Sequence, residues 1–441
     1  MQVIKVETNQ KRNMFFHETT ISPKEYKENI ENRVINVFPN YSYQNFLGFG
    51  GAFTEASGIC YSNLPQSQKD NLIKDYFSTS GLNYTLGRIP IGSTDFSKKS
   101  YSYAGKKDLS DFSIKKDENY IIPFIKDALT VCDIKFLASP WSPPKFMKQN
   151  KMLILGGILL DKYKKIYAEY LVKFIQSYER MNIPISFITV QNEPNATQPW
   201  ESCRFTSEQE AEFVKKYLYP EFIENNIETK IFIWDHNKEK LFQRANSIIN
   251  DPISNEAISG IAYHYYSGDH FENLKLTKEV FPNKMLFHTE GCTGHSFPNS
   301  SDELRNAEIY AHDIIGDLNN GCNAYIDWNL ILNYKGGPNH KLNFCNAPIM
   351  MNKDDSEYYK SLVYYYIGHF SKFIKPNAKR IAFSKYTDMI EVTSFINEDN
   401  SIVIVLLNKN NINKEYNLVL GNNVIHDNLD SHALVTYVIK K

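Results

Sequence analysis

The sequence predicts an α/β protein: a (β/α)8 TIM barrel with an attached antiparallel β-sandwich domain formed from both chain termini. In the middle of the chain, short apolar stretches alternate with longer segments of helical spacing. Both ends show the polar and apolar alternation of half-buried strands. A length of 441 residues leaves room for roughly two to three domains. We therefore expect a barrel over residues 46–375 and a sandwich made of residues 1–45 together with 376–441.

Eight apolar stretches are the expected barrel strands. They cover residues 45–53, 82–92, 133–141, 185–194, 229–237, 258–268, 283–292 and 322–332. The segments between them include residues 161–180 and 206–222, whose apolar residues recur every three or four positions, as on one face of a helix. Thr206 and Gln209 have the spacing of a capping box at the start of the second segment. Repeated eight times, this order favours a closed parallel barrel over an open doubly wound sheet.

The two ends of the chain predict antiparallel strands. Alternating stretches lie at residues 2–19 and 33–40 near the start, and at residues 390–411 and 431–441 near the finish. No linker rich in Pro, Gly or Ser separates them from the barrel. We therefore expect one sandwich, built from both ends and packed against the barrel.

The composition limits the function classes. With 42% hydrophobic and 22% charged residues, the chain is a soluble globular protein rather than a disordered one. A net charge of −1 gives no basic surface for nucleic acid or an anionic membrane. No signal peptide or transmembrane segment is visible, so we expect a cytoplasmic protein if the chain is complete and a secreted one if a leader has been removed. The sequence does not predict an oligomeric state.

A carboxylate follows the fourth expected strand. Asn192, Glu193 and Pro194 come directly after an apolar, β-branched run. Proline restricts the residue before it, so we expect Glu193 to be extended and its side chain to be held in place. A single glutamate after a strand is more often a loop cap than an acid or base, and the other strand ends must decide between these interpretations.

A second carboxylate, Glu290, follows the seventh expected strand. In a (β/α)8 barrel the residues after the strands meet at one face, so Glu193 and Glu290 are expected to face each other. Two facing carboxylates suit glycoside hydrolysis, in which one protonates the leaving oxygen and the other attacks or stabilises the anomeric carbon. Arg88 and Tyr266 are candidates for keeping the second carboxylate ionised.

Tryptophans also follow the expected strands. All four are predicted on this face of the barrel: Trp141, Trp200, Trp234 and Trp328. Their rings suit the apolar face of a sugar, although Trp141 and Trp328 have the alternative of simply filling the barrel top. Together with the carboxylates, they favour a carbohydrate pocket.

Metal binding is the weaker interpretation of the histidines. His264 has no partner at ligand spacing and is expected to hydrogen-bond beside the carboxylates. His288, Cys292 and His295 are close in sequence, but alternate strand residues face opposite sides, which argues against a zinc site.

Seven segments, in this order along the chain, carry a resemblance to a known family: "FGGAFTEASG", "GRIPIGSTDFS", "SPWSPPKFMK", "VQNEPNA", "HTEGC", "DWNLILNYKGGPN" and "GHFSKFI". They resemble glycoside hydrolase family 30, most closely its glucosylceramidase (acid β-glucosidase) branch. The resemblance implies a barrel with a β-sandwich and no metal or organic cofactor. It also implies hydrolysis of a β-linked glycoside by double displacement with retention, in carbohydrate or sphingolipid metabolism.

The resemblance assigns residues one by one. Glu193 matches the acid/base and Glu290 the nucleophile. The positions that match sugar-binding residues are Asp95, Trp141, Asn192, Trp328 and Asn343. Supporting places around the nucleophile match Arg88, His264 and Tyr266.

The predicted function is therefore a retaining β-glycosidase, specifically an exo-acting β-glucosidase of glucosylceramidase type. The segment after Glu193, "NATQPWESCRF", differs from that of the animal lysosomal enzyme. The sequence therefore does not identify the leaving group of the substrate. The alternatives are an endo-acting or other-sugar family member, such as a β-1,6-glucanase, β-xylosidase or β-fucosidase, and a catalytically silent carbohydrate-binding protein.

Overall fold

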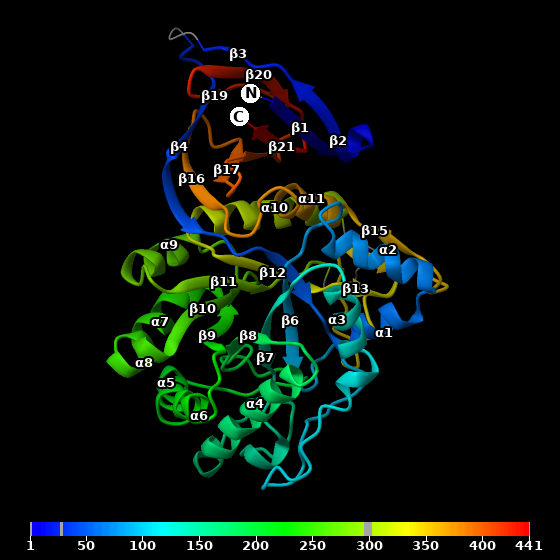
Figure 1. Cartoon of the computed structure of the whole chain (residues 1–441), viewed down its shortest axis with the longest axis vertical. Helices are drawn as coiled ribbons and strands as arrows, with labels where there is room; N and C mark the ends of the chain where they lie inside the picture. Colours follow the sequence, from blue (N-terminus) through cyan, green and yellow to red (C-terminus); the bar gives the residue numbers. More distant parts are fainter. Residues whose placement is uncertain (1, 27–29, 295–301, 441) are drawn as a thin grey trace.

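The computed structural model describes residues 2–26, 30–294 and 302–440. It contains a closed barrel of parallel strands and a mainly antiparallel sheet domain placed at one end of it (Figure 1). The N-terminus and the C-terminus both lie in the sheet domain. The predicted fold class is confirmed.

The barrel strands follow one another in chain order around the closed sheet. They are β5 (Phe49–Ala52), β6 (Leu86–Ile91), β7 (Lys135–Pro140), β8 (Ile185–Thr189), β9 (Lys230–Asn237), β10 (Ile258–His264), β11 (Met285–Glu290) and β12 (Ala324–Asn329). Each lies within or overlaps one of the eight predicted stretches. Most of their residues are buried because the strands are covered on both faces, which explains their nearly continuous apolar character.

Helices surround the barrel and also pack between it and the sheet domain. They are α1 (Glu55–Asn63), α2 (Gln66–Phe77), α3 (Ile121–Leu129), α4 (Lys164–Glu179), α5 (Ser207–Phe213), α6 (Tyr219–Glu224), α7 (Leu241–Ile249), α8 (Pro252–Ala257), α9 (Phe271–Val280), α10 (Glu303–Asn319) and α11 (Leu362–Ser371). The predicted capping box is present, because Thr206 Oγ1 accepts from the Gln209 backbone N–H and Gln209 Oε1 accepts from that of Thr206. No helix in the described ranges combines the length and apolar character needed to cross a bilayer.

A cluster of apolar side chains from the strands fills the barrel interior: Leu86, Leu137, Phe187, Phe232, Ala262, Phe287, Ala324 and Ile326. The rings of Phe187, Phe232 and Phe287 contact one another, with centroids 4.4 to 5.6 Å apart. The interior is therefore packed, and polar chemistry is confined to the barrel ends.

The sheet domain is one hydrogen-bonded sheet of ten strands whose two halves face each other as a sandwich. The strand order is β2 (Met14–Ile21), β1 (Gln2–Asn9), β21 (Ala433–Lys440), β18 (Ile402–Asn408), β17 (Glu391–Ile396), β16 (Lys379–Lys385), β4 (Val34–Asn45), β19 (Lys414–Leu420), β20 (Asn423–Leu429) and β3 (Lys24–Glu25). Strands from the two chain ends pair directly, with Val3 opposite Ile439. Side chains such as Ile404 and Leu418 share its core.

Helices α10 and α11 lie between the barrel and the sandwich (Figure 1). His369 of α11 is fully buried and contacts Thr8 of β1 and Thr436 of β21, each at 2.8 Å. A small third sheet joins β13 (Ile331–Leu332), β14 (Ile349–Met351) and β15 (Tyr358–Lys360) beside the barrel. These contacts fix the sandwich against the barrel.

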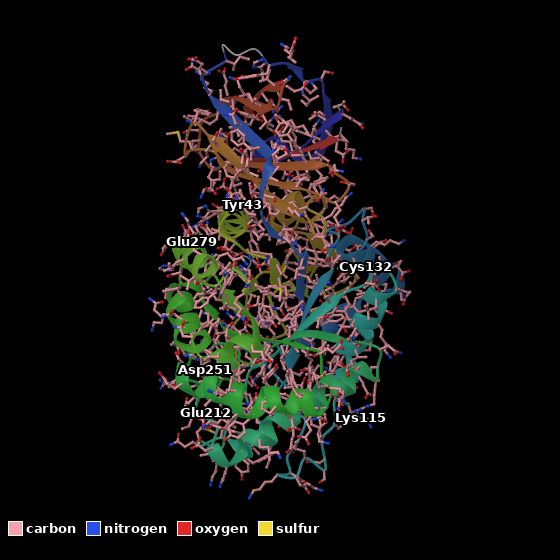
Figure 2. The ribbon with its side chains drawn as sticks, turned by 60° about the vertical axis from the view of Figure 1, so that its left-hand side comes forward. Tyr43, Lys115, Cys132, Glu212, Asp251 and Glu279 are labelled. Carbon is pink, nitrogen blue, oxygen red and sulfur yellow. The ribbon has the colours of Figure 1, made fainter. Side chains whose placement is uncertain are left out.

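A polar hollow of about 600 Å³ lies where β4 meets α9 and α10. Tyr43 and Glu279 contribute to its lining and are labelled in Figure 2. The Arg380 guanidinium lies 3.6 Å from the centre of the Tyr43 ring, so this aromatic face is already covered by the protein's own cation.

Candidate active site

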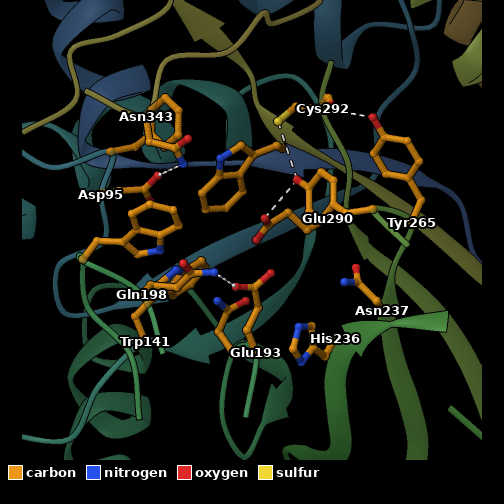
Figure 3. A pocket seen from close by; sticks show the side chains of 15 residues that line it. Asp95, Trp141, Glu193, Gln198, His236, Asn237, Tyr265, Glu290, Cys292 and Asn343 are labelled. Carbon is orange, nitrogen blue, oxygen red and sulfur yellow. Dashed lines mark hydrogen bonds between the residues drawn. The ribbon is translucent and has the colours of Figure 1, made fainter. Parts of the chain in front are cut away.

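A pocket of about 430 Å³ opens at the ends of the barrel strands where the predicted site residues lie. Eight of those residues line it: Asp95, Trp141, Asn192, Glu193, Tyr266, Glu290, Trp328 and Asn343 (Figure 3). The other two, Arg88 and His264, are fully buried and contact the pocket carboxylates from beneath. The structure thus brings the complete predicted set together.

Glu290 is the last residue of β11, and two donors hold its carboxylate. Arg88 Nη1 donates to one oxygen at 2.6 Å, and the Tyr266 hydroxyl donates to the other at 3.0 Å. Burial raises the pKa of the Glu290 carboxyl, and the positive charges of His264 and Arg88 oppose that rise. These neighbours are the groups available to keep Glu290 ionised inside a buried site.

Arg88 is a buried cation that connects several strand ends. Its guanidinium donates to Asp235 at 2.9 Å and to the Asn192 side-chain oxygen at 2.8 Å. It also lies 4.8 Å from the centre of the Trp141 ring and 5.5 Å from that of Trp328. A guanidinium held by several rigid partners positions the carboxylate it binds.

Glu193 has a left-handed backbone with φ of 49°, so the expectation of an extended conformation is wrong. Its N–H donates to the Asp235 carbonyl at 2.9 Å, and its own carbonyl accepts from the Ala196 N–H at 2.9 Å. These two bonds close a turn against β9, and they outweigh the preference that Pro194 imposes. The side chain nevertheless is held at the pocket, as a positioned acid requires.

His264 lies between two carboxylates. Its Nδ1 is 3.5 Å from Glu193 Oε1, and its Nε2 is 3.2 Å from Asp235 Oδ1. Burial alone would lower the pKa of His264, but Glu290, Asp235 and Glu193 raise it to about 9. Burial likewise disfavours ionised Glu193, yet the hydrogen bond from His264 lowers the pKa of Glu193 to about 2. These opposite shifts favour a protonated His264 beside an ionised Glu193.

The two predicted catalytic carboxylates are close together. An oxygen of Glu193 and an oxygen of Glu290 lie within 4.8 Å of each other and of a His264 ring nitrogen. Retaining glycosidases have carboxyl groups about 5 to 5.5 Å apart, whereas inverting enzymes separate them by about 6.5 to 9.5 Å to hold a water. The short separation fits direct attack by one carboxylate.

Asp95 is held on the side of the pocket opposite His236 and Asn237 (Figure 3). Its Oδ2 accepts from Asn343 Nδ2 at 2.9 Å and from Asn339 Nδ2 at 3.3 Å. Burial raises the pKa of Asp95 to about 8, although the hydrogen bond from Asn343 acts against the rise. This shift favours the protonated carboxyl, which can both donate to and accept from a hydroxyl group.

Three of the four tryptophans line the pocket. Trp141 and Trp328 stack on each other with ring centroids 5.4 Å apart and an interplanar angle of 24°, and Trp200 lies at the pocket wall. The expectation is wrong for Trp234, which belongs to β9 itself and is 1% exposed. Its indole N–H donates to the Asn237 carbonyl at 2.9 Å, so it fills space between the strand and its helices.

The predicted set of site residues omits several residues that the structure brings to the pocket. Asp235 accepts from Thr189 at 2.7 Å and Thr289 at 2.6 Å and so anchors Arg88 and His264. The side chains of Gln198, His236 and Asn237 line the pocket beside Glu193. The end of β9 was visible in the sequence as a polar triplet after an apolar run, and that signal places Asp235 and its two neighbours at the barrel mouth.

Two groups of described residues have the spacing of metal ligands. One is Glu193, His264 and Glu290, the centre of the pocket itself. The other joins His288 with Asp313 and Asp317, and there the Lys238 ammonium donates to both aspartates. That second group is already neutralised by a lysine, and His295 lies outside the described residues.

Comparison with known proteins identifies the family. The family model described as "Glycosyl hydrolase family 30 TIM-barrel domain" matches residues 46–374, and "Glycosyl hydrolase family 30 beta sandwich domain" matches residues 377–437. The lysosomal acid glucosylceramidase of Mus musculus is 33% identical over 399 residues, which cover 85% of this chain and 77% of that protein.

Solved structures agree with that assignment. The structure of SrfJ from Salmonella typhimurium superposes with a TM-score of 0.97 at 33% identity, and that of the endo-β1,6-glucanase BT3312 with a TM-score of 0.91 at 28% identity. Both comparisons cover 100% of each chain. The chain belongs to glycoside hydrolase family 30 and is a glycoside hydrolase.

Proposed function

We propose that this glycoside hydrolase is a retaining, exo-acting β-glucosidase of glucosylceramidase type, with Glu290 as nucleophile and Glu193 as acid/base. The observation that carries the proposal is the approach of the two carboxylates within 4.8 Å across one pocket, with Arg88 and Tyr266 bound to only one of them. That asymmetry supports different roles for two residues of the same type.

In the first step, a Glu290 oxygen attacks the anomeric carbon and the bond to the leaving oxygen breaks. The leaving oxygen takes a proton from Glu193, and the sugar becomes covalently linked to Glu290 with inverted configuration. Arg88 and Tyr266 hold the attacking carboxylate, so little reorganisation is needed in the transition state.

Glu193 must carry a proton for this step, and His264 supplies it. His264 Nδ1 lies 3.5 Å from Glu193 Oε1, and the carboxylates around His264 favour its protonated form. A substrate that displaces water from the pocket disfavours a charged Glu193, which moves the proton from His264 to the carboxyl. In the second step Glu193 removes a proton from water, which attacks the anomeric carbon and restores the β configuration.

The sugar lies against the side of the pocket that holds Asp95 and Asn343. Their side chains offer donors and acceptors to hydroxyl groups, and Trp141 and Trp328 offer apolar surface to the ring. Asn192, fixed by Arg88, is placed for the hydroxyl beside the anomeric carbon, where contacts strengthen in the transition state. The name of the mouse relative, lysosomal acid glucosylceramidase, supports glucose as the sugar.

The test is release of 4-nitrophenol from its β-glucoside, β-xyloside, β-galactoside and β-fucoside, followed by NMR of the first sugar formed. We expect the β-glucoside to be the best substrate and β-glucose to appear before its α anomer. A preference for another glycoside would show that the sugar of the substrate is not glucose. Initial formation of α-glucose would exclude a retaining mechanism.

A second candidate is an endo-acting β-1,6-glucanase. It is favoured by the TM-score of 0.91 and the full mutual coverage with the endo-β1,6-glucanase BT3312. Product analysis on β-1,6-glucan separates the two: an exo-acting enzyme releases glucose alone from the start, whereas an endo-acting one first releases oligosaccharides of mixed length.

A further inference from the structure

Two polar side chains at the end of β9 line the pocket with unused hydrogen-bonding capacity. His236 and Asn237 both line the pocket, and neither side chain makes a hydrogen bond within the part of the chain that the structure describes. His236 Nδ1 and Asn237 Oδ1 are covered by protein, so the other ring nitrogen of His236 and the amide nitrogen of Asn237 are the groups available to a bound molecule.

Neither side chain is needed for the local fold. Asn237 precedes a short 3₁₀ helix, Lys238–Lys240, but its side chain makes no capping bond there. Only its backbone carbonyl has a structural contact, accepting from the Trp234 indole N–H at 2.9 Å. The His236 ring packs against the Trp234 ring at a centroid distance of 5.1 Å, a contact that leaves its nitrogens uninvolved.

The position of these residues identifies the part of the substrate they face. Figure 3 shows Asp95 and Asn343 on one side of the two carboxylates, and His236 and Asn237 on the other. If the sugar lies beside Asp95, the leaving group must extend past Glu193 in the opposite direction, because Glu193 protonates the oxygen that joins the two parts. His236 and Asn237 therefore line the leaving-group side.

Their chemistry fits a polar leaving group. Burial lowers the pKa of His236, so its ring is neutral and has one donor and one acceptor nitrogen. Asn237 adds an amide, and the Gln198 amide, 3.4 Å from Glu193 Oε2, lies nearby on the same pocket wall. An alkyl chain in this position would cover the polar groups of the pocket wall without pairing with them, whereas hydroxyl or amide groups would pair.

We propose that His236 and Asn237 form a leaving-group subsite that selects β-glucosides whose aglycone carries a hydroxyl or amide group close to the scissile oxygen. The inference rests on the proposed β-glucosidase function and specifies the other half of its substrate. A second sugar and the head of a ceramide both have this chemistry. Comparing a disaccharide substrate with glucosylceramide distinguishes these two leaving groups.

The experiment compares substrates within each enzyme variant. The readout is the ratio of kcat/KM for gentiobiose, and separately for glucosylceramide in detergent micelles, to kcat/KM for hexyl β-glucoside, whose leaving group has no further polar atom. For Asn237→Leu and for His236→Phe we expect at least one ratio to fall about tenfold, because each variant removes hydrogen bonds to the polar substrate only. A larger fall for gentiobiose identifies a second sugar, and a larger fall for glucosylceramide identifies ceramide.

Two further variants control for general damage. His236→Gln keeps a polar atom near the position of Nε2 and should retain most of the ratio. Asn250→Leu repeats the Asn-to-Leu change at the exposed C-terminal cap of α7 and should leave the ratio unchanged. Unchanged ratios in both Asn237→Leu and His236→Phe would overturn the subsite. Failure of the unmodified enzyme to hydrolyse 4-nitrophenyl β-glucoside would instead overturn the proposed function, and the subsite with it.

Discussion

The two sides of the catalytic pocket differ in how their polar atoms are satisfied. On the sugar side, Asp95 is bound by Asn343 and Asn339. On the proposed leaving-group side, the His236 and Asn237 side chains have no hydrogen-bond partner among the described residues. The first side is preorganised by the protein's own hydrogen bonds, while in our proposal a bound molecule supplies the partners of the second. Under that proposal, turnover and leaving-group choice are carried by different residues.

Loss of the nucleophile should have the largest effect and should not depend on the leaving group. In Glu290→Gln the amide cannot attack the anomeric carbon, so we expect kcat on 4-nitrophenyl β-glucoside to fall by about 10⁴-fold or more. Glu279→Gln, the same change on the exposed face of α9, is the matched control and should stay within about twofold. Glu290→Gln activity within tenfold of the unmodified enzyme would rule out the assigned role.

Loss of the acid should affect substrates unequally. For Glu193→Gln we expect kcat/KM to fall by about 10² to 10⁴-fold on hexyl β-glucoside, whose leaving oxygen needs a proton. On 2,4-dinitrophenyl β-glucoside, which departs without one, the fall should be only a few-fold. Equal losses on both substrates would mean that Glu193 is not the leaving-group acid.

Truncation on the sugar side should lower activity moderately and uniformly. Asn343→Ala removes the side-chain amide that donates to Asp95 Oδ2 at 2.9 Å, and it also removes a polar group from the sugar-binding wall. We expect kcat/KM to fall by about 10 to 100-fold, by the same factor for gentiobiose and for hexyl β-glucoside. If the ratio of the two substrates changed as it is expected to in Asn237→Leu, the division of the pocket into two sides would fail.

The smallest effect is a pH dependence at the boundary between the sides. The pKa of His264 is raised to about 9 and that of Glu193 lowered to about 2, so the pair keeps its one proton between these limits and loses it above about pH 9. The same shift stabilises the fold fully below the unfolded pKa of about 6.5 and progressively less as pH rises through 9.

The kinetic consequence is a fall in kcat/KM for hexyl β-glucoside above about pH 9, approaching tenfold per pH unit. The leaving group of 2,4-dinitrophenyl β-glucoside departs without an acid, so kcat/KM for this substrate should not fall in the same pH range. A fall shared by both substrates near pH 8 would instead report ionisation of Asp95, whose pKa is raised to about 8.

The sequence predicted the barrel because its strands are short and apolar and are bounded by polar residues at their carboxyl ends. The same pattern predicts Glu193 and Glu290 at one mouth, since Glu290 ends β11 and Glu193 follows the end of β8 by four residues. Aromatic residues gave a weaker signal, because Trp234 is as apolar as Trp141 but belongs to the strand itself. Burial in a strand and exposure in a pocket wall cannot be separated by residue type.

Other features depend on contacts between distant segments and were not predictable. The left-handed backbone of Glu193 is fixed by the carbonyl of Asp235, which local sequence rules ignore. The shared proton depends on how His264 lies between Glu193 and Asp235. The unused atoms of His236 and Asn237 become visible only when all their neighbours are placed. Such properties follow from tertiary packing rather than from periodicity or spacing.

The central claim is that Glu290 forms a covalent bond to the sugar. Incubation with 2-deoxy-2-fluoro-β-glucosyl fluoride, whose glycosyl-enzyme hydrolyses slowly, followed by intact-protein mass spectrometry and peptide mapping, tests it directly. The account predicts a mass increase of one fluoroglucosyl group, located on the peptide that contains Glu290 and absent from Glu290→Gln. Turnover of the reagent without a covalent adduct, or an adduct on Glu193, would contradict it.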